Sequence, residues 1–258
     1  MQDLPTVRVR RLLFLVAALA LASAGATTSS TAADGNDGAT TTTTTTAAAA
    51  VTEPGGELVI ALPLQPNALD RVNGADQVSH NVANQMNDPL VWVNDAGEFE
   101  PALAESWSVA DDGVTWTFNL RQDVAFSNGE PFNADAVVFS WNANKNPENQ
   151  YFNVYERAAD VRAVDEFTVE LVSEDVNALF VGLTAAVWQF VPPQYYAEVG
   201  RVEFSQAPIG TGPFMLNEWV KGDRIVLDRN PNYWREGFPK LDRITFRPIT
   251  ESSTRAAA

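Results

Sequence analysis

The segment from Leu103 to Val138 restricts the fold more than any other part of this 258-residue chain, because polar and apolar residues alternate along it with a period of two. Trp107 and Val109 alternate with polar residues up to the turn Asp111-Asp112-Gly113, and the alternation resumes over residues 114–120. Two alternating runs around an Asp-Gly turn are typical of a β-hairpin. The pattern therefore predicts a hairpin with one buried aromatic face.

The same segment predicts a third strand and a helix. Val124 and Phe126 continue the alternation, and Ser127-Asn128-Gly129 then turns the chain. Asn133 is a residue type that caps helices, and Asp135 places a negative charge in the first turn, where the helix dipole favours it. We therefore expect strand, strand, strand, turn and helix in this order.

Shorter patterns predict the other elements. An apolar run at Glu57–Leu62 indicates a buried strand, and the helix after Asn133 is expected to end before Pro147. The remaining predicted elements are a helical segment within 70–90, strands at 161–164 and 167–172, a buried helix at 179–190, a hairpin of strands 214–220 and 224–228, a strand at 241–248 and the start of a helix at Thr250.

Two motifs resemble a known family. The first comprises Glu105-Ser106-Trp107, the turn Asp111-Asp112-Gly113 and the run TWTFNLRQDVAFSNGEPFNADAVVFSW at residues 115–141. The second comprises Pro208-Ile209-Gly210-Thr211-Gly212-Pro213-Phe214, then Trp219, Gly222 and Arg229-Asn230-Pro231-Asn232-Tyr233-Trp234. Together they resemble the extracytoplasmic solute-binding proteins of ABC importers, family 5, the peptide- and nickel-binding class. The resemblance extends over about Gly55 to Ala258.

This resemblance implies an α/β fold: the N-terminal lobe of a periplasmic-binding-protein-like structure (type II, cluster C) with an inserted smaller β-rich subdomain. Residues 55–89 and 211–258 would form a ligand-facing lobe, and residues 90–210 the inserted subdomain. The second lobe would be absent, so the ligand-facing lobe would be incomplete. We expect the chain to be the front part of a longer protein, because it stops within the opening turns of a predicted helix, and a helix of about eight residues is marginal alone.

The N-terminal residues predict export. Residues 1–26 combine Arg8, Arg10 and Arg11 with an apolar run at 12–22 and small residues, which is the pattern of a cleavable signal peptide. The apolar run is too short to cross a hydrocarbon core of about 30 Å. The paired arginines leave both the general secretory and the twin-arginine routes open. We expect an extracytoplasmic protein, in the periplasm or at the cell surface.

The amino-acid composition limits which kinds of molecule the protein can bind. Residues 27–54 are rich in Thr and Ala and predict a flexible linker. The net charge of −16 disfavours binding to nucleic acid or to an anionic membrane surface, because phosphate binding needs clustered Lys and Arg. The chain has no cysteine, which excludes disulfides, thiolate metal sites and a lipid-modified cysteine anchor.

Catalytic patterns are missing from the sequence. His80 is the only histidine, and no Gly-x-Ser-x-Gly elbow supports a serine nucleophile. One histidine without cysteine makes a zinc site unfavourable. Asp111 and Asp112 are neighbours in a predicted turn, where short polar side chains stabilise the backbone. We therefore predict a protein that is not an enzyme and has no metal or cofactor.

The resemblance also suggests ligand-binding residues. By position in the family pattern, an edge segment that approaches the ligand is Gln77, Val78, Ser79 and His80. Its backbone would pair with a peptide by strand addition, or it would be the exposed start of a helix. Aromatic residues near the cleft would be Tyr151, Phe152 and Tyr155, and Phe246 would end a strand that approaches the site, with core packing as its alternative role.

These observations predict capture of a peptide-like or related small solute by a monomer, for delivery to the permease of an ABC importer. Burial of the ligand at a domain boundary suits this role. Two alternatives remain: a secreted glycoside hydrolase that uses acidic residues, and a structural surface domain.

Overall fold

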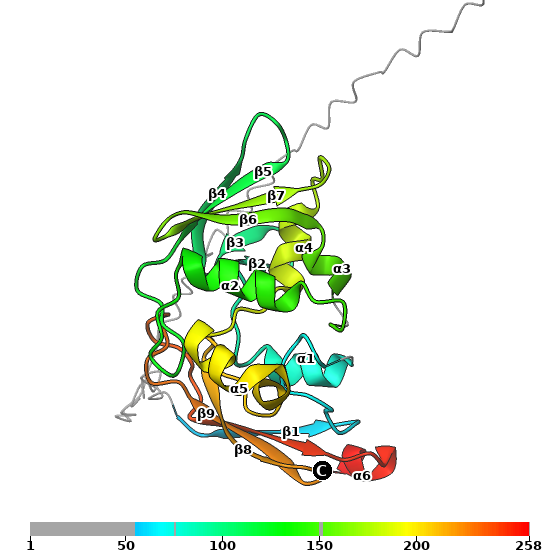
Figure 1. Cartoon of the computed structure of the whole chain (residues 1–258). Coiled ribbons are helices and arrows are strands. Elements are labelled where there is room, and N and C mark those ends of the chain that lie inside the picture. The colour runs from blue at the N-terminus through cyan, green and yellow to red at the C-terminus, as the bar shows by residue number, and fades with distance from the viewer. Residues whose placement is uncertain (1–54, 75, 150–151, 258) are drawn as a thin grey trace, which may run out of the picture. The chain divides into compact units, whose positions relative to one another are not determined.

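A computed structural model describes residues 55–74, 76–149 and 152–257. The predicted signal peptide and linker, at residues 1–54, lie outside the described residues, as does Tyr151. The strands are β1 (Glu57–Leu62), β2 (Val91–Val93), β3 (Phe99–Pro101), β4 (Ala104–Val109), β5 (Thr115–Leu120), β6 (Ala158–Asp165), β7 (Thr168–Ser173), β8 (Phe214–Val220), β9 (Arg224–Arg229) and β10 (Arg243–Pro248). The helices are α1 (Gln77–Ala83), α2 (Ala134–Asn144), α3 (Phe152–Tyr155), α4 (Phe180–Val187), α5 (Pro193–Gln206) and α6 (Ser252–Ala257) (Figure 1).

One sheet has the strand order β1-β10-β9-β8. Strand β1 pairs with β10 in parallel, with Leu58 opposite Ile244 and Ile60 opposite Phe246, whereas the other pairs are antiparallel. Because β1 precedes residue 90 and its partners follow residue 210, the chain leaves this sheet and returns to it. We call the described residues of 55–89 and 211–257 the sheet region. Its core contains Leu62, Leu69, Val82, Met86, Phe214, Ile225, Leu227, Ile244 and Phe246.

Residues 90–210, which we call the inserted region, contain a second sheet of order β4-β5-β7-β6. Its strands are antiparallel, with Trp107 opposite Phe118 and Val109 opposite Trp116, so the predicted hairpin is confirmed. Helix α2 packs on β6 and β7, and Asn133 caps it by accepting a hydrogen bond from the Ala136 N–H at 3.0 Å. The core of this region includes Phe118, Phe126, Phe132, Val137, Tyr155, Leu171 and Phe190.

The predicted strand at Val124 and Phe126 is wrong. The chain there folds back on itself, with a single bridge between Ala125 and Pro131. The Phe126 N–H donates to Glu130 O at 2.8 Å, which closes the turn before a strand can extend. Both predicted apolar side chains are nevertheless buried. Alternation predicted their burial correctly, but not the backbone pairing.

Several elements differ in length from the sequence prediction or were not predicted. Helix α1 covers only seven residues of the segment 70–90, because Asp70 organises the preceding residues into a turn. Strands β2 and β3 form their own antiparallel pair, and α5 begins at Pro193. Helix α5 contacts α2, and its Ser205 O accepts the Leu69 N–H at 3.0 Å, so it touches both regions (Figure 1).

Candidate functional site

A polar turn leads into α1. The Asp70 carboxylate is buried and accepts hydrogen bonds from the N–H groups of Val72 at 2.8 Å and Asn73 at 2.5 Å, and from Asn73 Nδ2 at 2.7 Å. Burial raises the pKa of Asp70, and the hydrogen bonds from Asn73 and Val72 oppose this rise. A short acidic side chain that bonds the backbone two and three residues ahead explains the local turn.

Asp76 begins α1 as its N-cap. Its carboxylate accepts the Ser79 N–H at 2.8 Å, as an N-cap residue should. Of the candidates on this helix, Gln77 is exposed, Val78 and Ser79 are buried, and His80 is half-buried. Two alternatives were expected for this segment, an edge that pairs with a peptide and the start of a helix. In the structure it is the start of a helix. The N–H groups of Ser79 and His80 are bonded to Asp76, so the strand-like pairing expected for a peptide is not available along this segment, and the side chains of Gln77 and His80 are its more accessible polar groups.

His80 connects α1 to the polar turn. Its Nε2 lies 2.7 Å from Gly74 O. Burial lowers the pKa of His80, and the charge of Arg71 lowers it further. The imidazole is therefore neutral at neutral pH and donates through Nε2 to the carbonyl oxygen.

A cavity of about 430 Å³ lies where α1 ends and β2 begins, and we call it the junction cavity. The residues that matter for its chemistry are Arg71, Asn84, Asn87, Asp88, Trp92 and Trp188. Arg71 Nη1 donates to Asn84 Oδ1 at 2.9 Å, and the Arg71 N–H donates to Gln189 Oε1 at 2.8 Å. The Arg71 backbone is thus held by the inserted region and its guanidinium group by the sheet region, in a cavity that amide and indole groups also line.

Asp88 is the buried acid of this cavity. Its carboxylate accepts hydrogen bonds from Trp234 Nε1 at 2.8 Å and from the Tyr233 hydroxyl at 3.2 Å. Burial raises the pKa of Asp88 to about 6, against the opposing effect of these two donors and of the Arg235 charge. Asp88 therefore joins the start of the inserted region to the second sequence motif.

Aromatic rings and cations stack across the same boundary. Trp92 of β2 and Trp234 stack with ring centroids 5.6 Å apart. Arg121 lies 4.5 Å from the Trp234 centroid, and Arg235 lies 5.0 Å from the Trp92 centroid. Each outer cation faces a ring, which is a favourable arrangement for a guanidinium group. The stack fixes the inserted region against the sheet region.

The backbone passes between the two regions twice, once outgoing near Met86 and once returning near Gly212, and we call these passages the chain crossings. The Gly212 N–H donates to Met86 O at 2.9 Å, and the Phe214 N–H donates to Gln85 O at 3.0 Å. A Cβ atom on Gly212 would lie 2.4 Å from the Met86 carbonyl carbon, closer than real contacts allow. The glycine of the second motif therefore permits direct backbone contact between outgoing and returning chain.

The predicted aromatic candidates lie in different places. Tyr155 is fully buried, its hydroxyl accepts the Gln189 N–H at 3.0 Å, and its ring stacks on Trp188 at 5.4 Å. It therefore supports the wall of the junction cavity from behind. Phe152 begins α3, and only its backbone is described. Tyr151 lies outside the described residues.

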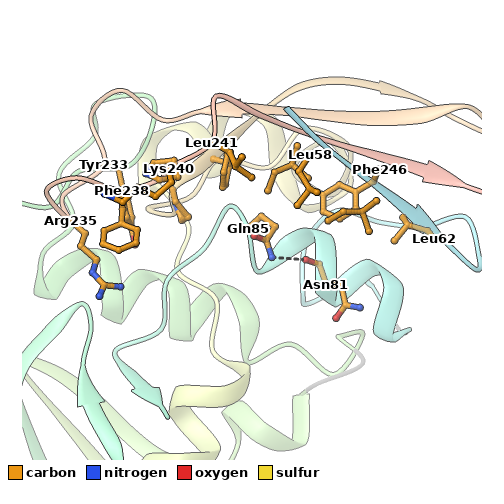
Figure 2. A pocket seen from close by; sticks show the side chains of 15 residues that line it. Leu58, Leu62, Asn81, Gln85, Tyr233, Arg235, Phe238, Lys240, Leu241 and Phe246 are labelled. Carbon is orange, nitrogen blue, oxygen red and sulfur yellow. Dashed lines mark hydrogen bonds between the residues drawn. The ribbon is translucent and has the colours of Figure 1, made fainter. Parts of the chain in front are cut away.

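Phe246 lies elsewhere. It is 3% exposed in the core of the sheet region, and it lines a different cavity of about 590 Å³ between α1 and strands β1 and β10 (Figure 2). Core packing, the alternative role for Phe246, is thus present in the structure. The sequence candidates do not converge on one cavity.

Sequence reasoning missed Arg71, Asn84 and Trp188. Arg71 and Asn84 flank a predicted helix with no motif of their own, and Trp188 lay within a predicted buried helix. One signal in the sequence could have pointed to Asp88. The hydroxyl group of Tyr233 and the indole group of Trp234 need a hydrogen-bond acceptor when they are buried. Asp88, in the residues that end a helix in the first half of the chain, is an acid that could supply it.

The chain thus forms a mixed α/β structure that leaves one sheet, builds a second one and returns, with a cavity where the two parts meet. Residues 98–258 match the model of the bacterial extracellular solute-binding proteins, family 5 Middle. The chain belongs to the bacterial extracellular solute-binding proteins, family 5.

Curated relatives and solved structures agree with this assignment. The glutathione-binding protein GsiB of Salmonella typhi is 33% identical over 204 residues, which are 78% of this chain and 40% of the relative. A peptide complex of DppA from Helicobacter pylori matches with a TM-score of 0.72 and 28% identity, over 80% of this chain and 45% of that one. NikA of Brucella suis in complex with Fe(III)-EDTA matches with a TM-score of 0.71 and 30% identity, over 79% and 41%.

The chain spans about 40% of the length of the curated relatives that it matches. This share agrees with the predicted fold class, in which the sequence forms one lobe. Among the helices of the described residues, none combines the length and the apolar character that a membrane crossing needs.

Proposed function

We propose that this chain contributes to capture of a peptide-like or related small solute outside the membrane, as part of a monomeric, non-catalytic binding protein that delivers the solute to an ABC importer permease. Membership of a family of solute-binding proteins is the observation that carries this proposal. The names of its relatives, which include a glutathione-binding protein and a peptide complex of DppA, support a solute with peptide groups.

The junction cavity offers the chemistry that such a solute needs. The guanidinium group of Arg71 suits a carboxylate, and the amides of Asn84 and Asn87 suit peptide groups. The rings of Trp92 and Trp188 provide apolar walls. We propose Arg71 and Asn84 as solute contacts, together with the exposed Gln77 and the half-buried His80. Tyr151 and Phe152 stay candidates on the sequence resemblance alone.

Two steps test this proposal. Native mass spectrometry of the protein purified from its own host identifies a solute that co-purifies, and calorimetry with glutathione and short peptides then gives its affinity. Arg71→Gln should weaken binding by about tenfold or more, because a hydrogen-bonded charge is lost. Arg162→Gln is the matched control, because Arg162 lies on β6 in an exposed pair with Glu170 and does not line the junction cavity.

Equal affinities for the two variants would remove Arg71 from the site. Turnover of a glycoside that is abolished by substitution of one Asp or Glu would contradict the binding function itself and favour the hydrolase alternative. Failure of every solute to raise the melting temperature would favour a structural surface domain.

A further inference from the structure

The cavity between α1 and strands β1 and β10, which we call the apolar cavity, has the size of a small-molecule site. Its volume of about 590 Å³ lies within the range of roughly 300–1,000 Å³ for ligand pockets. Figure 2 shows Leu58, Leu62 and Phe246 of the strands on the side that faces Asn81 of α1 and Gln85 of the turn after it. Leu58 is 43% exposed whereas Phe246 is 3% exposed, so the cavity opens toward the β1 edge.

One end of the apolar cavity is cationic. Arg235 and Lys240 both lie against the ring of Phe238, with Arg235 Cζ 4.4 Å and Lys240 Nζ 5.0 Å from its centroid (Figure 2). Within the part of the chain that the structure describes, neither cation forms an ion pair with a carboxylate, and no Asp or Glu lines this cavity. Two exposed cations at one end of a cavity that no acid lines stand out in a chain with a net charge of −16.

One negative charge that could compete for Arg235, that of Asp88, is already engaged. Asp88 acts electrostatically on Arg235, but its carboxylate is buried and accepts hydrogen bonds from Tyr233 and Trp234. The side-chain amides of Asn81 and Gln85 form the opposite wall of the cavity, and Gln85 is fixed there because its Nε2 donates to Asn81 O at 3.2 Å. The apolar strip and Lys240 thus remain available to one ligand, and Arg235, whose guanidinium group also faces the Trp92 ring, adds positive charge at this end.

We propose that the apolar cavity binds an amphipathic anion: a single carboxylate that carries an aliphatic tail. The carboxylate lies near Arg235 and Lys240, and the tail lies along Leu58, Ile60 and Phe246. Charge complementarity selects this class, because a neutral tail leaves the two cations without a counter-ion and a cationic amphiphile is repelled by them. The net charge of −16 disfavours an anionic bilayer, so the ligand is a single dissolved molecule.

This site is separate from the solute site proposed above. The two cavities share Pro213 and Tyr233 in their walls, but Arg71 and Asn84 line only the junction cavity, and Leu58 and Lys240 line only the apolar one. Substitutions can therefore affect one cavity and leave the other unchanged.

The test is calorimetric titration of the full chain with dodecanoate below its micelle concentration, beside dodecan-1-ol and dodecyltrimethylammonium. We expect one dodecanoate per chain, bound about tenfold more tightly than either analogue, since each analogue lacks the charged hydrogen bonds. Equal affinity for dodecan-1-ol would overturn the proposed role of the cations. Absence of dodecanoate binding would overturn the site.

Two matched pairs of variants locate the ligand. Lys240→Gln should weaken dodecanoate binding severalfold, whereas Lys221→Gln should not, although Lys221 also lies 5.0 Å from an aromatic ring, that of Trp219. Leu58→Glu should abolish binding because it places an anion in the cavity. Val59→Glu is its control, because the next residue on β1 faces the opposite side of the sheet and is 58% exposed.

Unchanged melting temperatures establish that these four variants are folded. Equal effects within either pair would contradict the proposed position of the ligand. Loss of dodecanoate binding in Arg71→Gln would show a single shared site and overturn the inference. Sedimentation that reveals a dimer abolished by Leu58→Glu would identify a second copy as the occupant, which also overturns it.

Discussion

The two hydrophobic cores of this protein are built from the same kinds of residues and are buried to a similar degree, but the core of the sheet region is bordered by a partly exposed apolar residue of β1, Leu58, that lines a cavity. In the inserted region Phe118, Phe132 and Tyr155 are fully buried, and helix α2 packs on the sheet. In the sheet region Leu58 is 43% exposed, and the β1–β10 half of the sheet faces the apolar cavity. Buried apolar surface stabilises the fold, whereas the partly exposed strip at Leu58 is the surface to which we assign a ligand.

The largest expected difference in stability is between a phenylalanine that is fully buried in the core of the inserted region and a leucine that is partly exposed on β1. Phe118→Ala should lower the free energy of unfolding by about 3–5 kcal/mol, because it leaves a cavity among packed side chains. Leu58→Ala should cost about 1 kcal/mol or less, since much of Leu58 is already in water. Urea denaturation followed by circular dichroism measures both, and equal costs would contradict the distinction between the buried and the partly exposed residue.

The second test concerns the boundary between the two regions, where Asp88 is buried. Its folded pKa of about 6 lies above the ordinary value, so the folded state binds the proton more tightly than the unfolded state does. The contribution of Asp88 is therefore most favourable below about pH 4 and is lost as the pH rises through 6, by up to about 3 kcal/mol. Asp88→Asn should remove this pH dependence.

Denaturation curves for both proteins at pH 4, 5, 6 and 7 give the difference directly. The acids whose pKa is lowered, such as Asp112 and Asp228, act with the opposite sign but are present in both proteins, so they cancel. Parallel stability profiles for the wild type and the variant would show that Asp88 has no raised pKa.

The third test compares two glycines. Gly212→Ala should cost about 1–3 kcal/mol, because its Cβ would meet the Met86 backbone at 2.4 Å where the two chain crossings touch. Gly182→Ala, within α4 of the inserted region, would place its Cβ 3.5 Å from the Phe99 ring, an ordinary contact, and should be neutral or stabilising by up to about 1 kcal/mol. Thermal unfolding distinguishes them, and a tolerated Gly212→Ala would show that the crossing can widen.

The smallest expected effect is shared by both regions. Asn133 caps α2 and Asp76 caps α1, each by accepting one backbone N–H. Because capping is local, Asn133→Ala and Asp76→Ala should each cost about 1 kcal/mol whichever core lies nearby. Chemical denaturation of the two variants tests this, and a clearly larger cost for one of them would show that the neighbouring core also governs the helix ends.

Local pattern was enough to predict much of the inserted region. The hairpin of β4 and β5 follows from alternation around an Asp-Gly turn, and α2 follows from its Asn133 cap. Both features are decided by residues close together in sequence. The strand expected at Val124 and Phe126 failed because the same alternation also fits a chain that folds back within a few residues.

The candidate site could be predicted only in part, because its walls depend on contacts between residues that are far apart in the sequence. Arg71 reaches its place through Gln189, more than a hundred residues away, and nothing near Arg71 signals this partner. Tyr155 looked like a ligand-facing aromatic residue, but it stacks behind Trp188. The resemblance identified the family, whereas the cavity walls depend on which distant segments meet.

The pair of chain crossings also has a mechanical consequence. Gln85 and Met86, in the turn that follows α1, and the returning residues Gly212–Phe214 are joined by two hydrogen bonds. Both segments are covalently continuous from one region to the other, so a force that pulls the regions apart is carried by two backbones and does not depend on the hydrogen bonds. Twisting one region about the boundary, in contrast, displaces the two segments relative to each other and strains these bonds. Two paired crossings therefore resist torsion in a way that a single-chain linker cannot.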